Sequence, residues 1–442
     1  MRPRSLPLAA RLLPARWLTG IWRNPDFAKL WGSLTITHFG GQVTFLALPL
    51  TAALLLHATP FQVGVLTAMG ALPYPIFGLF AGVLVDRARK LPVIVAMDVG
   101  RGLALAAIPA CAWFGALTMP VLYAVNFLVG LGGIIGWPAY QVFMTERVGR
   151  SHLVEANAKI GIADSAAQLL GPGIAGALIQ WLTAPFAILL DATGFFVSAA
   201  MLRGIPPRAS DMPKARARSV TREIGEGLRA VWRNPTLRAL VWSTGIWQVL
   251  RHAFVATVVL FGARALGFSA GHVGLLFMAG GIGSLAAAHL TERLNRRYGM
   301  GRTMLAGLGG TGAAWLTVAS AMGPAWLASV LFGGGLFLLD LTAMVFFINY
   351  LSLRQAATPD HLLGRVTATM ISLTISMAPL GGVAGGWIAD HLGLRAAMAI
   401  VGGCALFLAP LVAWLSPLSQ VRELPAPQEP AITESLAEET TY

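Results

Sequence analysis

Long apolar stretches recur along this chain, and short polar segments separate them. A helix needs about 20 apolar residues to cross a lipid bilayer. The stretches of that length predict an all-α integral membrane protein with twelve transmembrane helices. We expect them at about 31–55, 62–85, 92–115, 117–137, 158–181, 184–202, 237–261, 271–292, 303–321, 325–350, 366–389 and 396–415.

The composition agrees with lipid as the solvent. The chain is 56% hydrophobic and 12% charged, with a mean hydropathy of +0.68, whereas a soluble domain is about 25% charged. Its 50 Gly and 26 Pro lie inside the apolar stretches, where membrane helices use Gly for close packing and tolerate Pro. The net charge of +13 therefore reflects the lipid bilayer as a partner, and we expect no binding of nucleic acid.

The positive charges predict the orientation of the helices. With both termini cytoplasmic, all but four of the 32 Lys and Arg residues fall on the cytoplasmic side, as the positive-inside rule requires. The exceptions are Arg264 and Arg395 in outside loops and Arg101 and Arg251 within spans. This pattern favours a multi-pass protein of the bacterial inner membrane. The Arg-rich segment 1–24 is also compatible with a mitochondrial transit peptide, although a cytoplasmic tail is the simpler interpretation.

These features divide the chain into five segments. Residues 1–30 form a cytoplasmic tail, 31–202 the first six helices, and 237–416 the last six. Between the two halves, the basic linker 203–236 contains an amphipathic stretch with Ile224, Leu228 and Val231 on one face, which predicts a helix on the membrane surface. The acidic tail 417–442 is expected to be disordered.

An internal repeat relates the two halves. The sequence Trp22–Arg23–Asn24–Pro25 recurs at Trp232–Arg233–Asn234–Pro235, an offset of 210 residues. The same offset relates TPFQVGVL, which begins at Thr59, to SAGHVGLL, which begins at Ser269. Parallel six-helix repeats around a site at the membrane midplane are a known layout of secondary transporters, so we expect two pseudo-symmetric bundles. Duplication without transport is the plain alternative.

The loop after the second span carries a family resemblance. It reads Gly82-Val-Leu-Val-Asp86-Arg87-Ala-Arg89-Lys90. This resembles the G-x-L-a-D-R-x-G-R-[RK] loop of the major facilitator superfamily, shortened by one residue and lacking the second Gly. The resemblance implies that the loop latches the two halves on the cytoplasmic side, with Asp86 facing the positive end of a helix. An ordinary solvated turn is the alternative.

Other segments narrow the resemblance to one branch of that superfamily. In their order and spacing they are similar to enterobactin-type siderophore exporters and macrolide efflux proteins. The segments are 153–157 (LVEAN), 171–176 (GPGIAG), 190–195 (LDATGF), 363–366 (LGRV) and 379–382 (PLGG). The stretch 171–176 also resembles an antiporter motif, with Ala167 and Ala175 in place of two of its glycines, and it predicts a small-residue face for close helix packing.

Charged side chains within the spans require a reason, because each costs about 2.5–3.5 kcal/mol to insert. Asp98 and Arg101 share a helix face and are expected to form a structural or gating pair. Asp340 has no cation within one turn. Together with Asp191, it is a candidate to couple transport to protons, and the alternative is an ion pair between helices with Arg251.

Polar residues also recur in the first helix of each half. The 210-residue offset aligns His38 with Gln248 and Gln42 with His252, and the resemblance implies that this helix lines a central cavity. Packing residues with internal hydrogen bonds are the alternative. Two aromatic residues beyond Asp340, Phe346 and Phe347, are candidates to contact an apolar substrate.

These observations favour a secondary transporter that exports an amphipathic small molecule, such as a drug or siderophore, by alternating access in exchange for protons. A permease of the same fold that imports a metabolite is the main alternative. An intramembrane enzyme is remote, because the chain has neither H-E-x-x-H nor G-x-S-x-G. We expect no cofactor and no metal site, a proton gradient as energy source in the absence of a P-loop, and a monomer.

Overall fold

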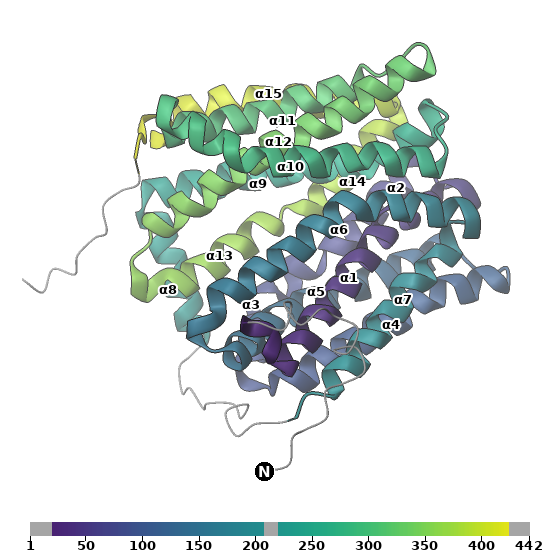
Figure 1. Cartoon of the computed structure of the whole chain (residues 1–442). Coiled ribbons are helices and arrows are strands. Elements are labelled where there is room, and N and C mark those ends of the chain that lie inside the picture. The colour runs from purple at the N-terminus through teal and green to yellow at the C-terminus, as the bar shows by residue number, and fades with distance from the viewer. Residues whose placement is uncertain (1–19, 207–219, 424–442) are drawn as a thin grey trace, which may run out of the picture.

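The computed structural model describes residues 20–206 and 220–423, and it is helical with no strand in these ranges (Figure 1). Most of the expected tails, and the linker residues 207–219, lie outside the described residues. The first half consists of α1 (Pro25–Leu50), α2 (Pro60–Ala71), α3 (Pro73–Arg87), α4 (Lys90–Trp113), α5 (Met119–Val148), α6 (Leu153–Leu182) and α7 (Ala184–Arg203).

The linker helix α8 (Val220–Arg233) leads into the second half. That half consists of α9 (Pro235–Leu260), α10 (Ala270–Tyr298), α11 (Met300–Ala319), α12 (Ala325–Ala356), α13 (Leu363–Ile375), α14 (Ala378–Leu392) and α15 (Leu394–Leu415). In the described part of the chain, eleven helical stretches are long and apolar enough to span a membrane. This count joins α2 to the start of α3, and α13 to α14. The remaining expected span, α11, packs between α12 and α15, and its glycines and Arg302 lower its hydropathy.

Two expected spans are broken. The second span divides into α2 and α3 at Leu72, and the eleventh divides into α13 and α14 at Ser376–Met377. Pro73 begins α3 and Pro379 lies in the first turn of α14. Proline lacks the backbone N–H that continues a helix and clashes with the preceding turn, so each span changes direction where its proline occurs.

The repeat seen in the sequence has a structural counterpart at each helix start. Asn24 caps α1 and Asn234 caps α9, each accepting hydrogen bonds from the backbone two and three residues on. Each amide also donates to a carbonyl across its half: Asn24 to Arg147 (3.4 Å) and Asn234 to Ala357 (3.0 Å). These carbonyls are themselves 210 residues apart. The cap explains why the first span begins at Pro25, before the apolar stretch.

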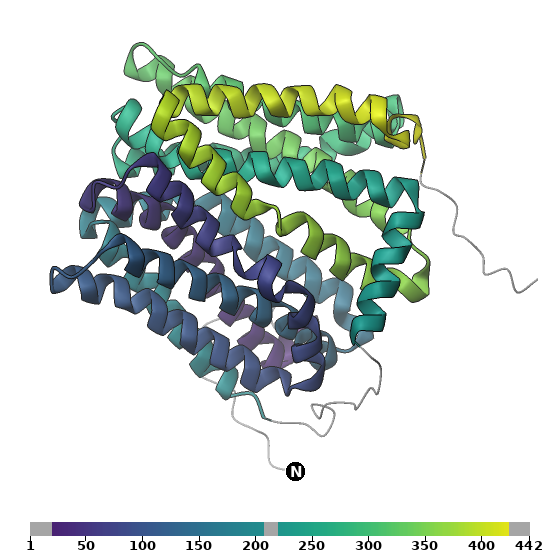
Figure 2. The same ribbon diagram turned by 180° about the vertical axis from the view of Figure 1, so that it is seen from behind.

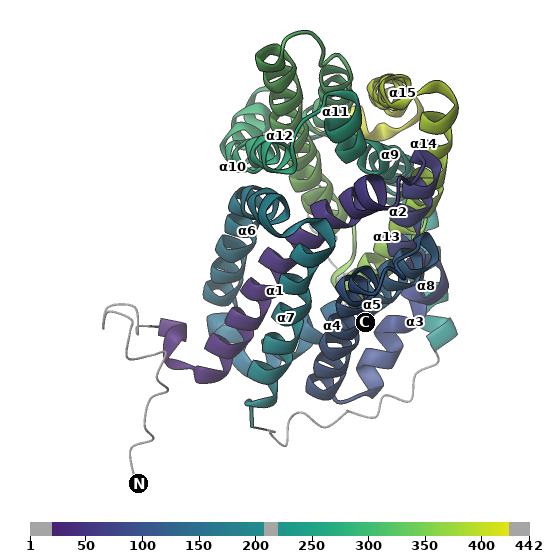
Figure 3. The same ribbon diagram turned by 90° about the vertical axis from the view of Figure 1, so that its right-hand side faces the viewer.

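The two halves meet through glycines related by the same repeat. A Cβ atom on Gly64 of α2 would lie 2.7 Å from the Cα atom of Gly386 of α14, and one on Gly274 of α10 would lie 2.9 Å from the Cα atom of Gly176 of α6. Only glycine permits such an approach of helix backbones. Figure 3 shows these two helix pairs on either side of the interface. The small-residue face expected in 171–176 is thus the packing surface for α10.

The halves approach each other at one end of the molecule and separate toward the other (Figure 1). The Gly64 and Gly274 contacts lie near the starts of α2 and α10 and the ends of α6 and α14. We call this end of the molecule, where the halves approach each other, the opposite end. At the other end, α1 begins, α15 ends and α8 crosses the ends of the spans (Figures 1 and 2), so we call it the terminal end.

Candidate functional site

Two opposite charges from different helices lie in the middle of the second half. Arg251 is near the middle of α9 and Asp340 near the middle of α12, and their charges interact. Protein surrounds both groups closely, yet both side chains keep exposed surface. They therefore face a space inside the molecule. Among the described residues, no hydrogen bond or ion pair links the Arg251 side chain to that of Asp340.

The surroundings of this pair combine charge with apolar surface. The Arg251 guanidinium lies 5.7 Å from the ring of Trp247, one turn earlier on α9. Phe347 is two turns beyond Asp340 on the same face of α12, and 45% of it is exposed. Its neighbour Phe346 is fully buried against Trp247. Of the two aromatic residues expected to contact an apolar molecule, only Phe347 is therefore accessible.

The four polar residues aligned by the repeat differ in their partners. His252 bonds through Nδ1 to the backbone oxygen of Gln248 at 2.9 Å, so its ring is held against the preceding turn of α9. Gln42 packs against Gly171 of α6. His38 is placed differently, because its Nδ1 lies 3.0 Å from a carboxylate oxygen of Asp164.

Asp164 of α6 is a site residue that we did not expect from the sequence. Its second oxygen accepts a hydrogen bond of 2.8 Å from Gln168, one turn on, so His38, Asp164 and Gln168 form one network between α1 and α6. The side chains of His38 and Asp164 are 24% and 45% exposed. The spacing of Asp164 and Gln168 was visible in the sequence, but their partner on α1 was not.

Asp191, Asp98 and Arg101 form a polar cluster among α1, α4 and α7. Asp191 is 2% exposed and accepts a hydrogen bond of 2.5 Å from Thr44. Asp98 accepts one of 2.6 Å from Ser198. Arg101 covers the Phe195 ring at 4.1 Å and interacts electrostatically with both acids. The expected pairing of Asp98 with Arg101 is thus indirect, since the hydrogen bond of Asp98 goes to α7. Asp191 is packed too closely to contact a substrate.

A small cavity connects this cluster to the network on α1. Its volume is about 280 Å³, and His38, Asp98, Arg101, Tyr74 and Trp137 are among the residues that line it. Polar groups from α1, α3, α4 and α5 therefore reach one partly open cavity in the first half.

The expected gating loop is a tight turn between α3 and α4. Lys90 begins α4, is 8% exposed, and donates a hydrogen bond of 3.0 Å to the carbonyl of Ala88. Arg87 and Arg89 are exposed. The surroundings of Gly82 and of the Asp86 side chain lie outside what the structure describes, so the latch remains a prediction.

Two pseudo-symmetric bundles of membrane helices, with polar groups facing an interior space at mid-depth, define the class of secondary transporters. Residues 30–378 match the Major Facilitator Superfamily. The chain is 30% identical over 372 residues to an uncharacterized MFS-type transporter, y4rN, of Sinorhizobium fredii, covering 82% of this chain and 88% of that protein. It is 28% identical to the multidrug efflux pump Tap of Mycolicibacterium fortuitum, covering 88% of this chain and 97% of Tap.

Solved structures agree with this fold. The nucleoside transporter NupG superposes with a TM-score of 0.73 at 12% identity, over 88% of this chain and 98% of that one. A bacterial homologue of the iron transporter ferroportin, solved in an inward-facing state, gives 0.70 at 16% identity, over 89% of this chain and all of that one. The chain belongs to the major facilitator superfamily. It is a multi-pass membrane transporter and not an enzyme.

Proposed function

We propose that this transporter exports amphipathic small molecules from a bacterial cytoplasm in exchange for protons, as a monomer with both termini cytoplasmic. The similarity to the multidrug efflux pump Tap along nearly the whole chain supports export. The distribution of Lys and Arg supports the orientation. In that orientation the terminal end, toward which the helices of the two halves diverge (Figure 1), faces the compartment from which cargo would be collected.

The observation that carries the proposal is the position of Asp340. Its carboxylate faces the interior space beside the apolar surface of Phe347, and it forms no ion pair with Arg251, the cation with which its charge interacts. A carboxylate placed in this way can bind a proton and release it as access alternates. A mainly apolar surface with few charges suits a hydrophobic cargo rather than a sugar or an organic ion.

Transport by everted vesicles tests the proposal. We expect an imposed gradient, acidic inside, to drive uptake of lipophilic dyes, and Asp340→Asn to abolish this uptake while leaving exchange down a dye gradient. Asp390→Asn, an exposed acid of α14 in the same half, should transport as the wild type does.

Two results would contradict parts of the proposal. Uptake that does not respond to the gradient would exclude proton coupling. Accumulation of dye in right-side-out vesicles under the physiological gradient would indicate import. A panel that adds siderophores to cationic and neutral dyes would then separate drug export from siderophore export.

A further inference from the structure

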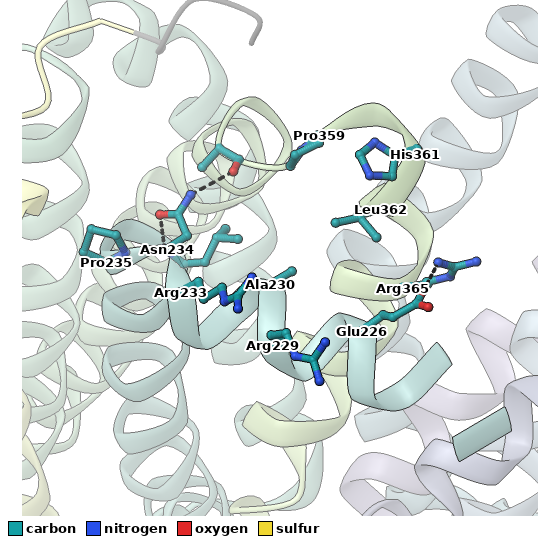
Figure 4. Close-up of a pocket in the computed structure, with 12 residues that line it drawn as sticks. Glu226, Arg229, Ala230, Arg233, Asn234, Pro235, Pro359, His361, Leu362 and Arg365 are labelled. Atoms are coloured by element: carbon teal, nitrogen blue, oxygen red, sulfur yellow. Dashed lines mark hydrogen bonds and ion pairs between the residues drawn. The ribbon is translucent and has the colours of Figure 1, made fainter. Parts of the chain in front are cut away.

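A hollow at the terminal end lies apart from the interior space between the halves. It has a volume of about 630 Å³. Its walls are α8 and the start of α9 on one side and the segment 357–365, which leads into α13, on the other (Figure 4). No step of transport proposed above uses this hollow.

The charged side chains that line the hollow are mostly cationic. Arg229 and Arg233 of α8 are one turn apart, are exposed, and make no hydrogen bond or ion pair with any described residue. Arg365 and His361 lie on the other wall, and Arg365 is paired with Glu226 (Figure 4). Among the described lining residues, one carboxylate therefore stands with three guanidinium groups, and these residues carry an excess of positive charge suited to a phosphate group.

The position of α8 determines which phosphate compound this is. The helix crosses the ends of the spans and is packed onto α13 where Gly227 meets Thr369. In the expected orientation, these span ends meet the lipid headgroups of the cytoplasmic leaflet. Beside the two arginines, the same helix exposes Leu228 (41%) and Trp232 (57%). Exposed Trp at this level is typical of a membrane interface. A soluble anion would leave this apolar surface unused, whereas the acyl chains of a lipid would cover it.

We infer that this hollow binds the headgroup phosphate of an anionic phospholipid. Arg229 and Arg233 hold the phosphate, and Leu228 and Trp232 contact the acyl chains. The bound lipid joins the linker helix to the start of α13, the half-helix that continues into the α14 contact with the first half. The inference does not depend on the cargo or on the coupling ion.

Native mass spectrometry of the full chain, released from bilayers of phosphatidylglycerol and phosphatidylcholine, tests this inference. We expect the wild type to retain phosphatidylglycerol in preference. R229Q/R233Q should bind it on the order of tenfold more weakly, because each juxtamembrane cation contributes substantially to anionic lipid binding. R229K/R233K, which keeps both charges, should largely retain it.

The matched control is R293Q/R297Q in α10. It removes two exposed arginines at the same spacing from the same end of the molecule, and it should retain the lipid as the wild type does. Equal retention by R229Q/R233Q and the wild type would overturn the inference, and so would an equal loss in the control. Displacement of the lipid by millimolar inorganic phosphate alone would overturn it in favour of a soluble anion.

Discussion

Arg264 donates hydrogen bonds to the backbone carbonyl of Ala58 at 2.8 Å and to that of Ala53 at 2.5 Å. Arg264 belongs to the second half and both carbonyls to the first, so this guanidinium joins the halves at the opposite end. The other cation expected in an outside loop, Arg395, bonds to the carbonyls of Ala319 and Ala321, which lie in its own half. Both guanidinium groups donate to two backbone carbonyls, but of the two arginines only Arg264 links the halves and can hold the opposite end closed.

Arg264→Gln should therefore shift the molecule toward a state open at the opposite end. Two charge-assisted hydrogen bonds are lost, so we expect the closed state to lose about 2 kcal/mol, roughly a thirtyfold change in the equilibrium. The measurement is labelling by an impermeant maleimide of a cysteine at Gly41, which has open space around it, in a chain with Cys111 and Cys404 replaced by Ala.

Arg395→Gln is the control for this experiment, because it removes the same kind of bond without separating the halves. It should lower the thermal stability but leave the labelling unchanged. If both variants increased labelling equally, Arg264 would have no particular role in closure.

Gly274→Val tests the glycine contact at the same end. The added side chain would collide with the backbone of α6 near Gly176, and such overpacking costs about 1–3 kcal/mol. We expect transport to fall and labelling at position 41 from the opposite side to rise. Gly403→Val in α15, where nothing lies within 4 Å of an added Cβ, should leave transport unchanged. Normal transport by the Gly274 variant would show that this approach of helices is not required.

In the first half, Asp164→Asn is expected to slow transport while changing the melting temperature little. Both side chains of the His38–Asp164 pair are partly exposed, and exposed ion pairs contribute about 1 kcal/mol or less to the free energy of unfolding. The variant should therefore unfold within a few degrees of the wild type. We expect it to transport dye more slowly, because the acid belongs to a partly exposed polar network between α1 and α6. A large drop in melting temperature with normal transport per folded molecule would make the pair purely structural.

The sequence was sufficient to predict the two halves, their repeat and the span positions, because lipid imposes long apolar helices and the offset aligns Asn24 with Asn234. It also predicted which charges lie within the long apolar helices. It offered Arg251 as a partner of Asp340 or Asp191 only as an alternative, and it did not predict the other partners. The pairing of His38 with Asp164 and the approach of Arg251 to Asp340 depend on how distant helices pack, and that is set by glycine contacts whose depth no periodicity reveals. The breaks at Pro73 and Pro379 were visible as prolines, but membrane helices often continue through proline.

Asp26 and Arg147 form the most deeply buried ion pair among the described residues, with 3.3 Å between carboxylate oxygen and guanidinium nitrogen. Asp26 is 4% exposed and Arg147 3%, and Arg147 also donates to the carbonyl of Pro206 at 2.8 Å. Removing one partner of a buried pair leaves the other charge uncompensated, which costs about 3 kcal/mol or more. We expect Asp26→Asn to lower the melting temperature in detergent clearly more than Asp164→Asn does. Asp26→Asn combined with Arg147→Met should recover part of that loss, because no buried charge then remains unpaired. If the double variant were less stable than Asp26→Asn alone, the packing and backbone contacts of Arg147 would outweigh its charge.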